Sequence, residues 1–472
     1  MWTLKPRQRY GGAALLVSCA LICTACGEGE PTQDEPDATS DTTRPPRPKT
    51  DRWKLSTLDV DFVGLNLRMA TSAQGVVGVA YYRTEGVEGD LCTELGVENP
   101  PIKTNWELKY AQLSGDSWSI ETVADAPFIG QPPGLDLKFN PANKPVIATM
   151  AGAPVVALRY CGVNNAALYT REGTSWQLDT AVSTSGAAAS GDSSSDFGFV
   201  VGYWPALAFD AAGQPALAYR DVHAGGIQND DFTRADLEFA YKRGASWSAF
   251  PVDMGRGAGN FNRMIFDAVD RPVLAYYNPT ELTAEPRIGI WVTRSEDGGA
   301  SWQRTQLFNR ATSEGPDVLR HPQTGDLHVA FYNSQRGYPQ LATLSDHDAF
   351  ESVSAWKLDD IGNNLYDEGV TPSLAVNADG QLAIAYYRCV KASAGLGRCH
   401  SDDDALIFAY NDGNEWRHEV VDSGDAGGPC GSRPALAFDA EHRPIIAYRC
   451  DTLVDDKVET HVKFARRERL PQ

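Results

Sequence analysis

The stretch Pro205-Ala-Leu-Ala-Phe-Asp210, followed by Pro215-Ala-Leu-Ala-Tyr219, decides the fold. It returns near the C-terminus as Pro434-Ala-Leu-Ala-Phe-Asp439 and Pro444-Ile-Ile-Ala-Tyr448. Each copy has a short apolar run, a turn of Ala, Gly, Asp or Pro type, and a second run that ends in Ala and an aromatic residue. Short apolar runs bounded by turn residues are typical of β-strands. An internal repeat of this kind predicts a fold built from copies of one unit.

The unit recurs through the whole body of the chain with a nearly constant internal spacing. A polar or turn-forming residue ends the first strand, and the Ala of the second strand follows eight positions later in six copies and nine positions later in the seventh. The six pairs are Ser72/Ala80, Asn140/Ala148, Asp210/Ala218, Asp267/Ala275, Asn377/Ala385 and Asp439/Ala447, and the seventh is His321/Ala330. Seven copies of this spacing predict a repeat architecture with seven units.

A tryptophan follows most of these pairs, usually with a glycine three residues before it. The tryptophans are Trp118, Trp176, Trp247, Trp302, Trp356 and Trp416, and the glycines are Gly115, Gly173, Gly244, Gly299 and Gly413. Trp356 is the exception, because Val353 stands at the glycine position. A glycine there supplies the positive φ of a tight hairpin, and the tryptophan starts the next strand with a large ring for packing. We therefore expect four antiparallel strands per unit, with two short turns on one side.

The two ends of the chain carry complementary fragments. Pro434 to Arg467 has three strands and no tryptophan, whereas Trp53-Lys-Leu-Ser-Thr-Leu-Asp59 is an isolated tryptophan strand. Pairing the first strand with the last three would close a ring and remove its open edges. The sequence thus predicts an all-β fold over residues 52–468. It is a seven-bladed β-propeller of four-stranded antiparallel blades, closed by an N-terminal strand that completes the last blade.

One turn resembles a known repeat family. Ser295-Glu-Asp297-Gly-Gly299-Ala-Ser301-Trp302 is similar to the Asp-box of bacterial-neuraminidase-type (sialidase-like) repeats, and Gly173-Thr-Ser-Trp176 is a reduced form of it. The resemblance rests on Ser295, Asp297, Gly299 and Trp302. In that family the Asp-box is a structural turn at the outer edge of a propeller, opposite the active face, and many members are not enzymes. The resemblance implies a propeller and leaves the activity open.

The sialidases of that family clamp a carboxylate with three Arg and use a Tyr activated by Glu, with an Asp as the acid. Their propeller has six blades, and their Arg-Ile-Pro motif is absent here, because Arg287-Ile288 precedes Gly289. No position of this chain matches their site residue by residue. We therefore expect a non-catalytic binding or scaffold module for a protein, peptide or glycan. The alternative is a sialidase-like glycoside hydrolase that acts on an anionic glycan.

The N-terminus has the three parts of a secretory signal peptide over residues 1–25: a basic start, an apolar run and small residues. Its end, Cys23-Thr24-Ala25-Cys26, resembles the bacterial lipobox, although Cys23 stands where Leu is usual. The resemblance implies acylation of Cys26, and Gly27 in place of Asp favours the outer membrane of the cell envelope. The alternative is an ordinary signal peptide cleaved after Ala25. Residues 26–51, rich in Pro and acids, predict a flexible tether.

Charge narrows the class of partner. The chain has 472 residues and a formal net charge of −20. This balance argues against nucleic acid, whose binders need a basic face, and against charge-driven adhesion to anionic lipid. We expect a protein or glycan partner, with the membrane reached only through the lipid anchor.

The cysteines predict disulfides. Six cysteines follow Cys26, and an even number in an exported chain favours pairing. No spacing is Cys-x-x-Cys, which argues against zinc. The simplest pairs are Cys389–Cys399, Cys430–Cys450 and Cys92–Cys161, although six cysteines allow fifteen arrangements.

The long connections of the units leave from one face, which we call the long-loop face, and the two short turns lie on the opposite, short-turn face. Variable loops usually carry binding. The third residue after the repeated Ala has one orientation in all units and gives candidate ligand-binding residues: Arg83, Asp221, Asn278, Asn333 and Arg388. Arg220 and Arg449 stand one position earlier and point to the other side. The alternative is that these strand-end residues only satisfy loop backbone.

The sequence gives only weak indications of a metal or cofactor site. His400-Ser-Asp402-Asp403-Asp404 and Asn229-Asp230-Asp231 are oxygen-rich loops of the kind that binds Ca²⁺, but neither has EF-hand spacing. The alternative is a solvated acidic loop. No phosphate-loop, dinucleotide, zinc-protease or nucleophile-elbow motif is present. We expect no catalytic residue, no metal and no cofactor, with calcium as the alternative.

Overall fold

The computed structural model describes residues 52–60, 63–89, 103–129, 134–157, 160–183, 200–222, 235–254, 257–279, 287–312, 315–362, 367–389, 404–423, 430–454 and 457–468. Within these ranges the regular structure is β-strand, apart from two short 3-10 turns, η3 (His347–Ala349) and η4 (Val353–Ala355). A helix long and apolar enough to span a membrane does not occur in the part of the chain that is described.

The strands form seven four-stranded antiparallel blades. Blade 1 is β2 (Val63–Thr71), β3 (Val77–Gly89), β4 (Lys103–Ser114) and β5 (Ser117–Ile129). Blade 2 is β6 (Asp136–Phe139), β7 (Pro145–Ala157), β8 (Tyr160–Glu172) and β9 (Ser175–Val182). Blade 3 is β10 (Val200–Phe209), β11 (Pro215–Val222), β12 (Ala235–Arg243) and β13 (Ser246–Asp253). Blade 4 is β14 (Asn260–Phe266), β15 (Pro272–Asn278), β16 (Gly289–Arg294) and β17 (Gln303–Phe308).

The remaining three blades complete the set. Blade 5 is β18 (Asp317–Arg320), β19 (Leu327–Asn333), β20 (Tyr338–Leu344) and β21 (Lys357–Asp360). Blade 6 is β22 (Asp367–Val376), β23 (Leu382–Cys389), β24 (Ala405–Asn411) and β25 (Trp416–Asp422). Blade 7 is β26 (Cys430–Phe438), β27 (Pro444–Val454), β28 (Lys457–Arg467) and the N-terminal β1 (Trp53–Val60).

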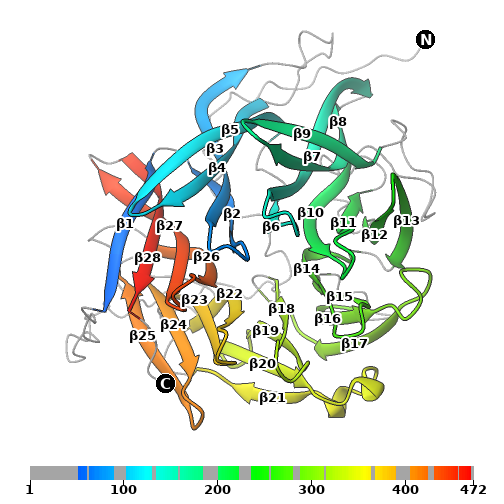
Figure 1. Ribbon diagram of the computed structural model, residues 1–472, viewed down its shortest axis with the longest axis vertical. Helices are drawn as coiled ribbons and strands as arrows, with labels where there is room; N and C mark the ends of the chain where they lie inside the picture. Colours follow the sequence, from blue (N-terminus) through cyan, green and yellow to red (C-terminus); the bar gives the residue numbers. More distant parts are fainter. Residues whose placement is uncertain are drawn as a thin grey trace, which may run out of the picture. The chain divides into compact units, whose positions relative to one another are not determined.

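The blades stand in a closed ring (Figure 1). The first strand of each blade is innermost and contacts the innermost strands of both neighbouring blades, including β26 of blade 7 with β2 of blade 1. A single parallel pairing, Val200 of β10 with Asn164 of β8, joins the sheets of blades 2 and 3. The prediction of an all-β, seven-bladed propeller is confirmed.

The ring is closed by the N-terminal strand, as the sequence predicts. β1 pairs antiparallel with β28 from Trp53 opposite Arg467 to Val60 opposite His461. The indole of Trp53 lies edge-on to the ring of Phe408 in blade 6, with centroids 5.2 Å apart. The outermost strand of blade 7 therefore comes from the opposite end of the chain from its other three strands.

The polar residues of the repeat each cap the turn between the first and second strands, and we call them turn residues. Asp267 shows the pattern: its Oδ1 accepts hydrogen bonds from the N–H groups of Val269 and Arg271, both at 3.0 Å. Equivalent acceptors are Ser72, Asn140, Asn377 and Asp439. His321 accepts through Nδ1 in a turn that is one residue longer, which explains its separation of nine from the repeated Ala.

The glycine and tryptophan of each repeat take the places predicted for them. Gly115, Gly173 and Gly244 have φ values of 63°, 64° and 65° in the hairpins before the fourth strands. Each is a position where L side chains are strained. Blade 5, where Val353 replaces the glycine, instead has η3 and η4 between its third and fourth strands. Phe350 in this insertion packs against Trp356 at 5.8 Å between centroids.

The core lies between the blades. The buried apolar side chains form seven clusters, and each cluster joins the facing sides of two neighbouring blades. The repeated Ala of every blade has no exposed surface. A small side chain is required there because the sheets approach closely, and a larger one would overpack the interface.

Candidate binding site at the centre of the ring

Four residues near the start of the innermost strands share a backbone conformation that residues other than glycine rarely adopt. They are Trp204, Phe261, Thr371 and Arg433, with φ values of 50°, 50°, 53° and 53°. Each lies six positions before the turn residue of its blade. Such a conformation costs on the order of 1–3 kcal/mol, and this kind of strain concentrates at functional sites.

A β-bulge produces this conformation in each of the four strands. In blade 3 the register between β10 and β11 shifts between Tyr203 and Ala206, around Trp204. Equivalent shifts occur in blades 4, 6 and 7. Two positions before each strained residue stands a glycine of positive φ, namely Gly202, Gly259, Gly369 and Gly431. Bulges redirect side chains, and these four act at equivalent points of the ring.

Three of the redirected side chains meet at the centre of the ring, and we call them the central cluster: Trp204, Phe261 and Arg433. The rings of Trp204 and Phe261 have centroids 4.1 Å apart with an interplanar angle of 46°. The guanidinium carbon of Arg433 lies 5.7 Å from the centroid of Phe261. Arg433 belongs to β26 and Phe261 to β14, which lie on opposite sides of the ring (Figure 1). The cluster therefore spans the centre.

Two glycines make room for the aromatic pair. Gly134 in blade 2 and Gly315 in blade 5 stand at the position equivalent to the strained residues. A Cβ at Gly134 would lie 2.7 Å from Cε3 of Trp204, and a Cβ at Gly315 would lie 2.1 Å from Cβ of Phe261. Both distances are too short for real atoms. The two aromatic side chains thus depend on glycines in the blades beside them.

A buried amide braces the cluster. Nδ2 of Asn262 donates to the backbone carbonyl of Trp204 at 2.6 Å and to that of Gly259 at 3.2 Å. Asn262 is fully buried, and its Oδ1 has no hydrogen-bond partner among the described residues. Phe261 is buried, whereas Trp204 and Arg433 are half-buried. Trp204 and Arg433 are therefore the members of the cluster that keep exposed surface.

Two acids, the buried Asp136 and the half-buried Asp317, tie innermost strands to one another nearer the short-turn face. Asp136 of blade 2 accepts a hydrogen bond from the N–H of Leu207 in blade 3, and Asp317 of blade 5 accepts one from Leu374 in blade 6, both at 2.8 Å. Burial raises the pKa of Asp317, although the bond from Leu374 opposes the shift. These acids fix the frame on which the central cluster is carried.

The residues predicted as a binding mouth stand at the ends of second strands, one per blade. They are Arg83, Asp221, Asn278, Asn333 and Arg388. Two positions before them stand aromatic residues, tyrosine in four blades and Phe331 in blade 5, that pack towards the preceding blade; for example, Tyr276 donates to Asp253 of blade 3 at 2.6 Å. Alternate strand residues point to one side. The side chains of the five residues therefore point towards the interface with the preceding blade. They do not point towards the central cluster.

Their contacts are varied. Asn333 Oδ1 accepts hydrogen bonds from the N–H groups of Gln335 at 3.0 Å and Arg336 at 3.2 Å, so it satisfies loop backbone. Asp221 and Asn278 are buried, and Arg388 lies opposite Glu368 in the register of blade 6. A role of this set in ligand binding stays a prediction.

One predicted disulfide is confirmed. Cys430 and Cys450 are bonded across β26 and β27, three residues before the strained Arg433. Cys92 and Cys399 lie outside the described residues, as do Cys26 and the side chains of Cys161 and Cys389. Their acylation or pairing stays a prediction.

The described residues contain one group of three side chains placed like metal ligands: Asp422, Cys430 and Cys450, with ligand atoms within 4.8 Å of one another. Both sulfurs are in the disulfide, so neither is a thiolate that could bind a metal. Of the loops considered for calcium, residues 229–231 and 400–403 lie outside the described ranges. Asp404 is buried and accepts a hydrogen bond from the hydroxyl of Tyr387.

The turn that carries the Asp-box resemblance joins β16 to β17 on the short-turn face. Ser295 Oγ accepts from the N–H of Gly299 at 2.7 Å, and Asp297 Oδ1 accepts from the N–H of Ser301 at 2.8 Å. The indole of Trp302 donates to the carbonyl of Gly299 at 3.0 Å. These bonds hold the hairpin and stabilise the charged form of Asp297, so its pKa falls to about 2.

Sequence reasoning missed the central cluster. A signal was present: Gly-x-Trp204, Gly-x-Phe261, Gly-x-Thr371 and Gly-x-Arg433 all stand at one distance from a turn residue. A glycine at fixed register inside a strand indicates a bulge, which would have pointed to the residue two positions on.

No protein-family model matches the chain, and no curated protein matches it. Similar solved structures include a protein of unknown function from Dyadobacter fermentans, at 13% identity and a TM-score of 0.44, covering 74% of this chain and 97% of that one. The Aleuria aurantia lectin has 12% identity and a TM-score of 0.42, over 78% of this chain and all of that one (100%). The NanB sialidase of Streptococcus pneumoniae has 12% identity and a TM-score of 0.44, over 87% and 69%. Similarities of this size say nothing about what the chain binds.

Proposed function

We propose that the protein is a non-catalytic binding module that holds a glycan against the central cluster, on the long-loop face. The observation that carries this proposal is the convergence of two aromatic rings and a guanidinium from three blades, each from a strained backbone position. Binding sites combine an apolar or aromatic surface with a few directed polar groups. A protein keeps strained conformations where they serve a site.

A sugar suits this chemistry because its ring has apolar C–H faces and its edge carries hydroxyls. The half-buried indole of Trp204 offers an apolar face together with one N–H donor. The half-buried Arg433 offers several N–H donors in a fixed geometry for hydroxyl or carboxylate oxygens. Both groups start from positions that packing has already fixed, which lowers the entropy lost on binding.

The central cluster has no residue that could serve as a general acid or nucleophile. Glycoside hydrolysis generally uses two carboxyl groups that flank the scissile bond. Trp204, Phe261 and Arg433 can orient a sugar but cannot supply this chemistry. For this reason the binding role ranks above catalysis.

A second candidate, a sialidase-like glycoside hydrolase acting on an anionic glycan, is favoured by one observation. Tyr219 lies opposite Glu238 in the register of blade 3, and its hydroxyl has no hydrogen-bond partner among the described residues. Burial, followed by the charge of Glu238, raises the pKa of Tyr219 well above its ordinary value. Tyr219 and Glu238 are 0% and 1% exposed, so a substrate could reach them only if blade 3 moved.

The proposal also includes an anchor at the outer membrane, in the cell envelope. Cys26 is acylated after removal of residues 1–25, and residues 26–51 form the tether. The chain enters β1 at the short-turn face, because fourth strands begin next to the short turns. Incorporation of a labelled fatty acid, lost in Cys26→Ser, tests the anchor independently of glycan binding.

The binding test uses the full chain in detergent on a glycan array, followed by titration calorimetry with the glycans that bind. Trp204→Gly and Arg433→Gln should each weaken binding at least ten-fold, and glycine is compatible with the φ of residue 204. Arg310→Gln, at an exposed arginine outside the cluster, is the control. Wild-type protein that binds no glycan would refute the proposal, as would cluster variants that bind like wild type. If a protein or peptide is captured instead and its binding is lost in Arg433→Gln, the central cluster is the binding site but its ligand is not a glycan, and the glycan proposal is refuted.

The hydrolase alternative has its own test. Fluorogenic sialosides and neutral glycosides are incubated with the full chain and with Glu238→Gln. The binding role predicts no turnover with either protein. If the wild-type protein hydrolyses a glycoside and Glu238→Gln does not, the protein is a glycoside hydrolase and the proposal of a non-catalytic role is refuted.

A further inference from the structure

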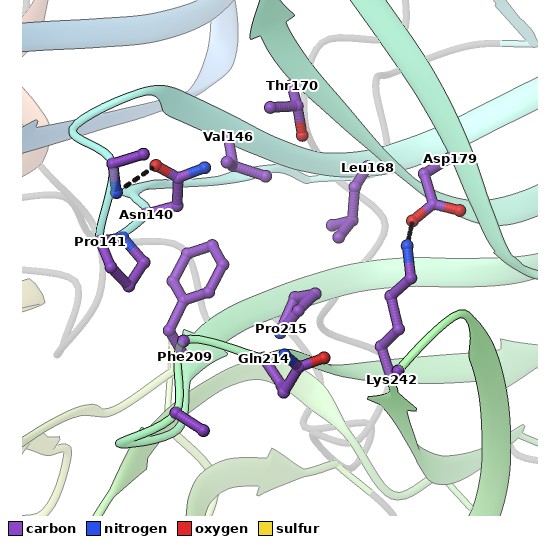
Figure 2. Close-up of a pocket in the computed structure, with 14 residues that line it drawn as sticks. Asn140, Pro141, Val146, Leu168, Thr170, Asp179, Phe209, Gln214, Pro215 and Lys242 are labelled. Carbon is purple, nitrogen blue, oxygen red and sulfur yellow. Dashed lines mark hydrogen bonds and ion pairs between the residues drawn. The ribbon is translucent and has the colours of Figure 1, made fainter.

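The short-turn face has a cavity between blades 2 and 3, away from the central cluster. Its volume is about 410 Å³, and its walls come from both turns and from the third strands of the two blades (Figure 2). This volume lies within the range of small-molecule sites in proteins. We call the cavity the blade 2–3 groove.

Small residues in the third strand of blade 2 leave this groove open. Leu168 lies opposite the repeated Ala148, and Thr170 lies opposite Val146. At the first of these positions blades 1, 3, 6 and 7 carry Tyr110, Phe239, Phe408 and Phe464. At the second, blade 6 carries Tyr410. Blade 5 carries the same pair, Leu341 and Thr343, so Leu168 and Thr170 leave space beside blade 3 but do not define the groove by themselves.

The floor and one wall are apolar. Val146 and Leu168 line the side of blade 2, and Phe209 and Pro215 line the side of blade 3. Figure 2 shows the ring of Phe209 between the two turns. An apolar floor with one aromatic ring can take up the C–H face of a small ligand.

Polar groups without intramolecular partners line the same groove. The side chains of Thr170 and Gln214 make no hydrogen bond with the described residues, and both border the groove. Oδ1 of Asn140 is occupied by its own turn, and Figure 2 shows its nitrogen on the side facing Val146. A hydroxyl and two amides can therefore exchange hydrogen bonds with a ligand.

The charges of the groove cancel. Lys242 Nζ lies 2.6 Å from Asp179 Oδ2, and the indole of Trp247 donates to the same carboxylate at 3.2 Å. Both side chains are half-buried, and because the two charges neutralise each other the groove presents no net charge that would attract an anionic or cationic ligand. The groove thus favours an uncharged ligand.

From these observations we infer that the blade 2–3 groove binds an uncharged mono- or disaccharide. Phe209 and the apolar floor take the C–H face, while Thr170, Gln214 and Asn140 exchange hydrogen bonds with hydroxyls. This site lies on the opposite face from the central cluster and uses none of its residues. It adds a second site to the proposed function and stands independently of it.

The test is saturation-transfer NMR on the full chain in detergent. The probes are glucose, galactose, mannose, N-acetylglucosamine, cellobiose and lactose, with sialyllactose as the charged comparison. At least one neutral sugar should give a signal. Thr170→Tyr, which introduces the residue that blade 6 has at this position, should weaken binding at least ten-fold. Thr180→Tyr, at an exposed threonine of β9, is the matched control and should bind like wild type.

The outcomes separate this site from the central one. Trp204→Gly should leave the signal unchanged, and a loss of signal in that variant would assign the binding to the ring centre instead. No signal from any neutral sugar, or an equal signal in Thr170→Tyr, would overturn the inference, as would binding of sialyllactose alone. If Thr170→Tyr lowers the melting temperature, Gln214→Ala replaces it and should weaken binding three-fold or more.

Discussion

At the scale of single residues, the most unusual positions are the four with positive φ at the ring centre. Trp204, Phe261 and Arg433 form the central cluster, and Thr371 occupies the equivalent place in blade 6. Thr371 is β-branched, and its hydroxyl is buried without a hydrogen-bond partner among the described residues. It thus combines backbone strain with an unsatisfied polar group.

Replacing Thr371 by glycine should stabilise the protein. Thr371→Gly removes the Cβ that opposes a φ of 53° and also removes the hydroxyl. We expect a gain of about 1 kcal/mol in the free energy of unfolding, reduced by the greater freedom of glycine in the unfolded chain. Urea titration measures it. Thr371→Ala is the control, because it keeps a Cβ and most of the strain; a stability loss in the glycine variant alone would contradict the strain argument.

His328 gives a residue-scale prediction about pH. Burial lowers its pKa to about 4, so it stays neutral in the folded protein. In the unfolded chain the imidazole binds a proton below its ordinary pKa near 6.5. Stability should therefore fall as pH drops from about 6.5 towards 4, by about 2 kcal/mol at pH 5.

The variant His328→Gln isolates this contribution. It cannot titrate, so the difference between its stability at pH 7 and at pH 5 should be about 2 kcal/mol smaller than in wild type. Urea titrations at the two pH values measure both proteins. Equal pH dependence of the two would show that another group is responsible.

Individual residues differ in how readily the sequence reveals them. The turn residues and hairpin glycines could be predicted because a local turn needs those residue types. Trp204, Phe261 and Arg433 could not, because their side-chain direction depends on a bulge and on glycines in neighbouring blades, Gly134 and Gly315. A tryptophan beside an apolar run is more often a packing residue.

At the scale of strands and blades, a recurring contact clasps neighbouring blades. An acid three positions after the tryptophan of one blade accepts a hydrogen bond from the indole of the next blade, and a cation of that blade pairs with it. Trp53 donates to Glu419 at 3.0 Å, and Trp176 donates to Glu121 at 3.2 Å. Arg467 and Arg171 supply the cations. The repeated tryptophans therefore help to connect neighbouring blades.

These two of the clasps differ in burial, which gives a matched pair of variants. The side chains of Arg467 and Glu419 are 1% and 8% exposed, whereas those of Arg171 and Glu121 are 28% and 31% exposed. Glu419→Ala removes the carboxylate that pairs with the buried guanidinium of Arg467 and should cost about 3–4 kcal/mol, while Glu121→Ala should cost about 1 kcal/mol or less. Urea titration compares them. Equal losses would mean that burial does not set the strength of the clasp.

Blade-scale features were the most predictable from sequence. Complementary fragments at the chain ends predict β1 in blade 7, and the pairing of Trp53 with Arg467 confirms it. The residues three positions after the repeated Ala do share one orientation. Their approach to the preceding blade was not predictable, because the repeat spacing alone does not say which face of a blade meets which neighbour.

At the scale of the whole molecule, β1 and β28 suggest a rearrangement of the chain order. Trp53 and Arg467 lie opposite each other at the short-turn face. In the other blades the end of the third strand and the start of the fourth lie opposite each other in the same way, on either side of a short turn. A Gly-containing turn of the kind found at Gly173 could join them directly. A circular permutant that begins after residue 60 and carries β1 behind β28 should fold, with a melting temperature within a few degrees of wild type.

The control for this permutant is deletion of β1 without reattachment. That chain exposes the edge of β28 and loses the clasp at Glu419, so it should aggregate or melt far below wild type. Thermal unfolding followed by circular dichroism compares the three chains. A permutant that fails to fold while the deleted chain folds would show that β1 does not close the ring.

The position of β1 in the chain also delays its pairing during protein synthesis. The strand that pairs with β1 is β28, and the facing residues Trp53 and Arg467 are about 410 positions apart in the chain. At about 5–20 residues per second, β1 leaves the ribosome on the order of 20–80 s before β28 has been made. During this interval its edge has no native mate, and a product truncated near its C-terminus never acquires one. The ring can therefore close only after translation has passed β28.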